Sequence, residues 1–134
     1  MPTLQLKISP SQSPERQQKL AQTLTRLAAQ HLGKRPEVTA VMIEGLSDRQ
    51  WFVADREVSA ATAWLEISVT AGTNSPHEKA SFIAAAFAEL QEQLGAGEDL
   101  EPASYVIVRE LPAGDWGYGG QTQQARQLTR RQAA

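Results

Sequence analysis

Alternating apolar and polar residues near the start of the chain recur in its second half. Leu4–Ile8 has a period of two, which predicts a strand with one buried face. The tetrapeptide Leu6–Ser9 (LKIS) recurs as Leu65–Ser68 (LEIS), inside a second predicted strand at 63–69. The chain is therefore organised as an internal repeat.

Each copy of the repeat continues with the signals of one helix. In the first copy, Ser13 is a good N-cap, Pro14 suits the first helical position, and Gly33 tolerates the positive φ of a C-cap. Side chains at helical spacing, which predict the stripe that faces the core, are Leu20, Leu24, Leu27 and His31.

The second helix has the same length between its two signals. Ser75–Glu78 (SPHE) forms a capping box, and Gly95 ends the helix. Its predicted apolar stripe is Ile83, Phe87, Leu90 and Leu94. The two copies differ in length only between elements, where loops tolerate change.

A further strand follows each helix, at Val38–Glu44 and at Ala103–Arg109. A strand–helix–strand unit has parallel strands and a right-handed crossover. Two such units predict an α+β fold, with a four-stranded sheet and both helices on one face. We expect the opposite face to be partly apolar, and oligomerisation to cover it, because of Val41, Ile43, Val106 and Val108.

The chain of 134 residues is long enough for a single domain. We place the first unit at 2–58, the second at 59–120, and a polar tail at 121–134. The basic end of that tail, after Arg126, is interpreted as frayed or as a short helix on a neighbouring subunit.

Charge and composition exclude several functions. A net charge of −2 offers no electrostatic case for nucleic acid or a membrane as partner. No apolar run approaches the roughly 20 residues of a membrane span, and the N-terminus lacks the pattern of a signal peptide. We therefore expect a cytoplasmic protein. Cysteine is absent and the two histidines lie far apart, so no metal site is expected.

Met1-Pro2 is the dipeptide with the clearest chemical potential. Methionine before a small residue is readily removed, which would leave Pro2 as an N-terminal secondary amine. An α-amino group titrates near 7.7–8.0, and burial or a nearby cation lowers that value. A neutral amine at neutral pH is a competent general base.

The proline and the repeat together resemble the tautomerase superfamily. The segment Glu110–Gly120 (ELPAGDWGYGG) is similar to the end of 4-oxalocrotonate tautomerase, where an acidic residue is followed by aromatic-Gly-x-Gly-Gly. The doubled unit is similar to macrophage migration inhibitory factor. That branch also has a Gly-Lys-x-Pro segment, here Gly33–Pro36, and a tyrosine that starts the last long strand, here Tyr105.

This resemblance implies a homotrimer with a barrel-like core and active sites between subunits. It implies keto–enol tautomerisation of a small 2-oxo acid without a cofactor, with Pro2 as catalytic base. Lys34 would bind the substrate carboxylate, and Tyr105 and Trp116 would form an apolar wall.

The sequence departs from the family pattern at several substrate-binding positions. Arginines that bind a dicarboxylate in 4-oxalocrotonate tautomerase are replaced at Gln12, Thr39 and Tyr105, which argues against a dicarboxylate substrate. An asparagine of the other branch is replaced by Ile107.

Two other functions stay open at this point. A protonated Pro2 would favour hydration or dehalogenation of an unsaturated acid, although Glu110 and Arg109 should lie on opposite faces of their strand. The chain could also be a trimeric binding protein with a vestigial proline.

Overall fold

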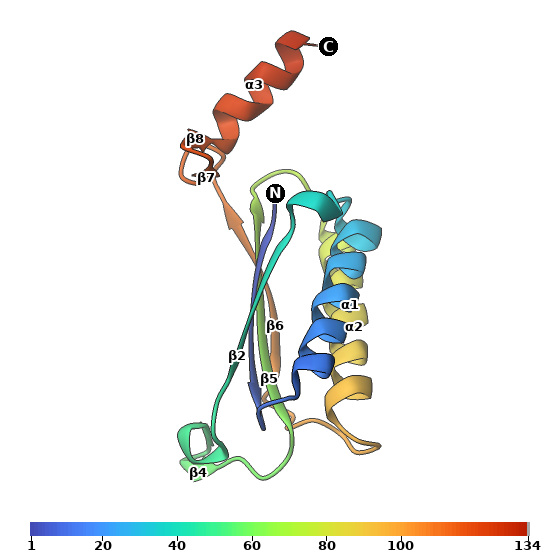
Figure 1. Cartoon of the computed structure of the whole chain (residues 1–134). Helices are drawn as coiled ribbons and strands as arrows, with labels where there is room; N and C mark the ends of the chain where they lie inside the picture. Colours follow the sequence, from blue (N-terminus) through green and yellow to red (C-terminus); the bar gives the residue numbers. More distant parts are fainter. Residues whose placement is uncertain (134) are drawn as a thin grey trace.

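One four-stranded sheet, covered on one face by two long helices, forms the body of the protein in a computed structural model that describes residues 1–133 (Figure 1). The strand order is β2-β1-β5-β6. Strands β1 and β2 are parallel, as are β5 and β6, and β1 pairs with β5 antiparallel. The strands are β1 (Thr3–Ser9), β2 (Ala40–Gly45), β5 (Thr62–Thr70) and β6 (Tyr105–Leu111). The predicted α+β fold is confirmed.

Both long helices begin and end where their capping residues predict. Helix α1 (Pro14–Leu32) follows Ser13, whose hydroxyl accepts from the Arg16 backbone N–H, and it ends at Gly33 with φ of 67°. Helix α2 (Pro76–Leu94) begins with a complete capping box formed by Ser75 and Glu78. The caps satisfy N–H groups that a helix start leaves without internal partners.

A small hairpin follows the last long strand of each unit. The first consists of β3 (Phe52–Val53) and β4 (Arg56–Glu57), and the second of β7 (Gly117–Tyr118) and β8 (Gln121–Thr122). Both have two-residue turns at positive φ, which is the hairpin geometry that matches strand twist. Gly119 and Gly120 occupy the second turn, whereas Gly117 is needed because a Cβ there would collide with the carbonyl of Gln121.

The remaining elements are short. They are η1 (Pro36–Val38), η2 (Asp48–Gln50) and the C-terminal helix α3 (Gln123–Ala133). The segment interpreted as a polar tail thus contains β8 and a helix, and Figure 1 shows α3 extending from the end of the sheet where the chain starts. None of the helices described between residues 1 and 133 combines the length and apolarity needed to cross a membrane.

The core lies between the sheet and the two helices. Its fully buried side chains include Leu4, Leu24, Ile67 and Phe82. The predicted stripe of α2 was wrong at one position, because Ile83 is 38% exposed and Phe82 takes the buried place. Similarly, Leu32 is buried at the end of α1, whereas His31 is only half-buried.

The uncovered face of the sheet differs from its prediction. Val41, Ile43, Val106 and Val108 pack against the core on the helix side. The open face is instead a mixture, with Lys7 over the ring of Trp64 and exposed apolar side chains at Met42 and Tyr105. The error arose because the burial of edge strands β2 and β6 depends on their register with β1 and β5.

Replacing Phe82 with alanine should lower the free energy of unfolding by about 3–5 kcal/mol, because a fully buried ring would leave a cavity. Urea unfolding at fixed protein concentration measures this. The control is Ile83→Ala on the same helix, which should cost under about 1.5 kcal/mol because its side chain is partly solvated. Equal losses for the two variants would contradict the assignment of the core face.

Candidate active site at the N-terminal end of the sheet

Pro2 lies buried immediately before β1, at the end of the sheet that also holds the C-terminus of α1. Its carbonyl accepts from the backbone N–H of Ala40 at 3.2 Å, so it is held as an extension of the β1–β2 ladder. With Met1 present, the Pro2 nitrogen belongs to an amide and cannot take a proton. Removal of Met1 would turn the same atom into an amine at a position fixed by the sheet.

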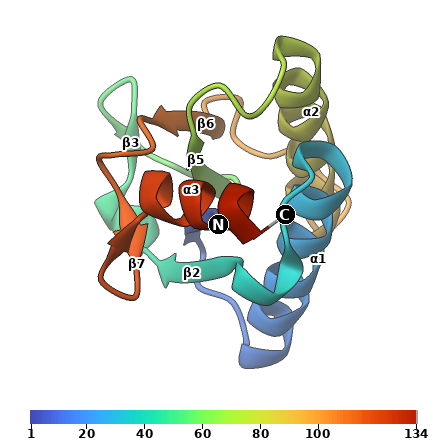
Figure 2. The same ribbon diagram turned by 90° about the horizontal axis from the view of Figure 1, so that it is seen from above.

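Several cations surround the chain start. Burial lowers the pKa of the Met1 amine, and the positive charges of Lys34, Arg130 and Arg35 lower that pKa further. Figure 1 places the N-terminus below α3, and Figure 2, seen from above, shows α3 crossing over it. The Met1 amine is therefore held toward its neutral form.

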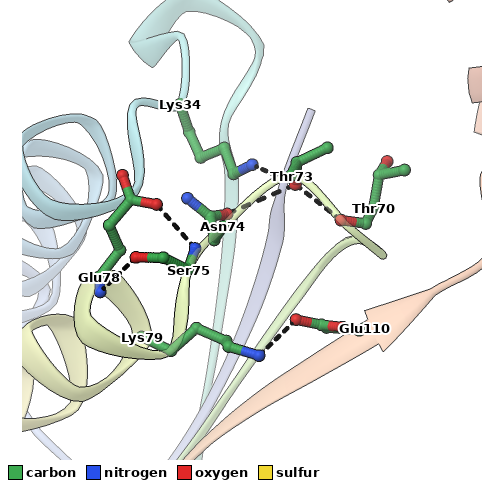
Figure 3. Close-up of polar contacts among 8 residues, drawn as sticks. All are labelled: Lys34, Thr70, Thr73, Asn74, Ser75, Glu78, Lys79 and Glu110. Carbon is green, nitrogen blue, oxygen red and sulfur yellow. Dashed lines mark hydrogen bonds and ion pairs between the residues drawn. The ribbon is translucent and has the colours of Figure 1, made fainter.

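Lys34 extends from the end of α1 toward the loop that follows β5. Its backbone N–H donates to the Ala28 carbonyl, and its ammonium donates to the Thr73 hydroxyl at 3.1 Å (Figure 3). Burial lowers the Lys34 pKa, whereas the charge of Glu78 raises it.

The Glu78 carboxylate does not form an ion pair with Lys34. It accepts from the Ser75 backbone N–H at 2.8 Å in the capping box, and this contact is the main reason why the pKa of Glu78 is lowered. Among the described residues, no carboxylate lies within ion-pair distance of the Lys34 ammonium. The ammonium thus remains available to an anionic ligand.

Trp116 lies at the same end of the sheet as Pro2. Its indole N–H donates to the hydroxyl of Thr70 at 3.3 Å, and Thr70 is the last residue of β5. In the antiparallel register Thr3 pairs with Ser68, so the end of β5 lies beside the start of β1. Trp116 also borders a pocket of about 290 Å³ formed by the second hairpin and the loop before it.

Tyr105 is not brought to this end of the sheet within one chain. It pairs with Trp64, which in turn pairs with Lys7. Lys7 is five residues beyond Pro2, or roughly 17 Å along a strand at about 3.4 Å per residue. Tyr105 is 59% exposed at the far end, so it could meet Pro2 only from another subunit.

The acidic and basic candidates on β6 have other partners. Glu110 forms an ion pair of 2.6 Å with Lys79 of α2, as Figure 3 shows. Arg109 lies 3.9 Å from Glu66. The two side chains therefore point to opposite faces, as their alternation predicts, and β5 lies between them and β1.

The sequence interpretation did not assign a role in the site to Thr70 or Thr73. It also missed Arg35 and Arg130, whose charges lower the pKa of the N-terminal amine. Thr70 ends β5, and Thr73 lies in the loop that connects β5 to α2, close to the recognised Ser75 cap. Position relative to a strand end could have suggested Thr70. Nothing in the sequence indicates that Thr73 would meet Lys34, because 39 residues separate them.

The relationship of this site to known proteins is clearest in the first unit. Residues 2–61 match the family model described as Tautomerase enzyme. No protein of the curated collection is matched.

The fold extends this similarity across the chain. A fused 4-OT solved as an asymmetric trimer has 22% identity and a TM-score of 0.82, covering 92% of this chain and 98% of its own. A protein named Pt0534, solved after inactivation by 2-oxo-3-pentynoate, has 18% identity and a TM-score of 0.82, with the same two coverages. Macrophage migration inhibitory factor of Toxoplasma gondii has 17% identity and a TM-score of 0.74, covering 90% and 98%.

These structures establish a common fold, and the family model begins at the proline of the candidate site. Residues 2–61 of this protein therefore match the tautomerase family, and the chain as a whole has the fold of these solved structures.

Proposed function

We propose that this protein is a keto–enol tautomerase of small 2-oxo or enol acids, with Pro2 of the processed chain as general base. The observation that supports it best is the position of Pro2, which is buried in the β1–β2 ladder at the start of β1. The positive charge of Lys34 lowers the pKa of the α-amine at this end of the chain. A neutral amine and a cation at one end of a sheet are the two groups that this reaction needs.

The reaction requires one proton to move between two atoms of the substrate. The neutral Pro2 nitrogen takes the proton from the enol oxygen, and the resulting ammonium returns it to carbon, so that the double bond shifts to C=O. In the reverse direction the amine takes the proton from carbon. No proton or electron is gained or lost overall.

Lys34 binds the substrate carboxylate in this proposal. Its ammonium has three hydrogens and donates one of them to Thr73, so two remain for an anion. Its charge also keeps the pKa of the nearby amine low, which maintains the basic form at neutral pH. Trp116 provides an apolar wall that limits access of water.

The active site would be completed by a neighbouring subunit. Fused 4-OT is a trimer, and the open sheet face of this chain exposes Met42 and Tyr105. A trimer would let Tyr105 of one subunit approach Pro2 of the next, which the distance along the sheet forbids within one chain.

Pro2→Ala should reduce kcat/KM by about 10²–10⁴-fold, the usual contribution of a general base. Phenylenolpyruvate is a suitable substrate for the assay. For the wild type, kcat/KM should rise with pH through the Pro2 pKa, because the unprotonated amine reacts, and that pKa should lie below the roughly 7.7–8.0 of an ordinary α-amine.

Intact mass is the control for this experiment, since the active chain must begin at Pro2. An active protein that retains Met1 would contradict the mechanism, as would unchanged turnover in Pro2→Ala. A rate that falls as the amine loses its proton would indicate an acid role and favour hydration or dehalogenation instead.

Lys34→Ala should reduce kcat/KM for a carboxylate substrate by about 10- to 100-fold, since a hydrogen bond between charged groups contributes about 1.5–3 kcal/mol. The pH at which kcat/KM rises should also move upward, because the cation that lowers the amine pKa is lost. Lys19→Ala, at an exposed position of α1, is the matched control. Normal kinetics in Lys34→Ala with a large loss of stability would assign Lys34 a structural role only.

Sedimentation should give a mass three times that of one chain. Met42→Arg should shift the population toward smaller species, because it would bury a charge in the interface. Met42 is 53% exposed in the single chain, so the substitution should not unfold the monomer. Ile83→Arg, on the helix side, should remain trimeric. A stable wild-type monomer would rule out a site shared between subunits.

A further inference from the structure

We infer that Thr73 is a positioning residue of this site, which holds the Lys34 ammonium in place for the substrate carboxylate. The inference rests on the proposed function, since it assigns a role to a residue that supports Lys34. It follows from three hydrogen bonds made by the segment between β5 and α2. Figure 3 shows two of them, from Lys34 to Thr73 and from Thr73 to Thr70.

The Thr73 hydroxyl is oriented by its own donor bond. Its proton goes to the Thr70 carbonyl at 2.6 Å, with a longer contact of 3.4 Å to the Asn74 side-chain oxygen. A hydroxyl has one hydrogen and two lone pairs. With the hydrogen used, the oxygen presents only lone pairs toward Lys34, whose ammonium donates to it at 3.1 Å.

Both partners of this contact are attached to rigid elements. Lys34 is held at its backbone by the Ala28 carbonyl at the end of α1. The loop is held to the same helix end, because the Asn74 side chain donates to the Leu32 carbonyl at 2.9 Å. A flexible four-carbon side chain is thereby fixed at its root and at its tip.

The same loop connects the cation to the aromatic wall. Thr70 accepts the Thr73 proton at its carbonyl and the Trp116 indole N–H at its hydroxyl. Lys34 and Trp116, which come from different units of the repeat, are thus linked through two threonines. The arrangement sets the distance between the charged end and the apolar wall of the site.

Thr73→Val keeps the shape of the side chain and removes its oxygen. It should raise KM for phenylenolpyruvate by roughly tenfold, since misplacing a binding group by about 1 Å costs up to about 10²-fold. Its kcat should change by less than about threefold, because ground-state and transition-state binding are weakened alike. Thr73→Ser should restore KM, as it restores the oxygen.

Thr25→Val is the matched control. Thr25 also donates to a backbone carbonyl, that of Ala21 at 2.7 Å, but it lies within α1 and has no contact with Lys34. This variant should keep the wild-type KM.

A double-mutant cycle separates positioning from a merely structural role. In a Lys34→Ala background, Thr73→Val should have no further effect on KM, because the group that it positions is gone. Additive effects, or an unchanged KM in Thr73→Val, would overturn the inference and leave the tautomerase proposal intact.

NMR titration of the Lys34 side chain tests the inference without turnover. Loss of an acceptor destabilises the charged ammonium, so Thr73→Val should lower the Lys34 pKa further, with Glu78 and the chain-start amine as the other charges that act there. Thr25→Val should leave that pKa unchanged. A wild-type protein without activity would defeat the proposed function, whereas an unmoved Lys34 pKa in Thr73→Val would defeat only the role of Thr73.

Discussion

The antiparallel pairing of β1 with β5 is the interaction on which the rest of this structure depends. Each unit is parallel within itself, and only this ladder, from Thr3 opposite Ser68 to Ser9 opposite Thr62, joins the two central strands. Because the pairing is antiparallel, the start of the first unit meets the end of β5 in the second. The candidate site is therefore built by both units, and neither unit contains it alone.

The two units of the repeat share backbone hydrogen bonds but differ in the side chains that could act on a substrate. The backbone N–H of Val58 donates to the carbonyl of Trp51, seven residues earlier. In the second unit, the N–H of Gln123 donates to the carbonyl of Trp116 at the same separation. Lys34, however, has Ala96 as its counterpart after the helix-ending Leu-Gly pair. A tight turn or a cap repeats because it satisfies backbone groups anywhere, whereas the cation is present at only one end of the sheet.

Electrostatics at that end favour a neutral amine and an accessible ammonium together. The nearby carboxylate of Glu78 is occupied by the start of α2, so that it moderates the charge of Lys34 without pairing with it. Lys79, the residue after Glu78, forms an ion pair with Glu110. The capping box thus contributes twice, since it begins a helix and also engages the carboxylate of Glu78, whose charge acts on Lys34.

The sequence by itself determined the elements of this protein. The strand at the N-terminus, both helices with their caps at Ser13 and Ser75, and the repeat depend on periods and end signals that span a few residues. Only the tertiary structure decided which face each edge strand buries, why Phe82 rather than Ile83 enters the core, and that Thr73 meets Lys34. It also placed Tyr105 at the far end of the sheet. These outcomes depend on register and on contacts between residues far apart in the chain, which no local pattern encodes.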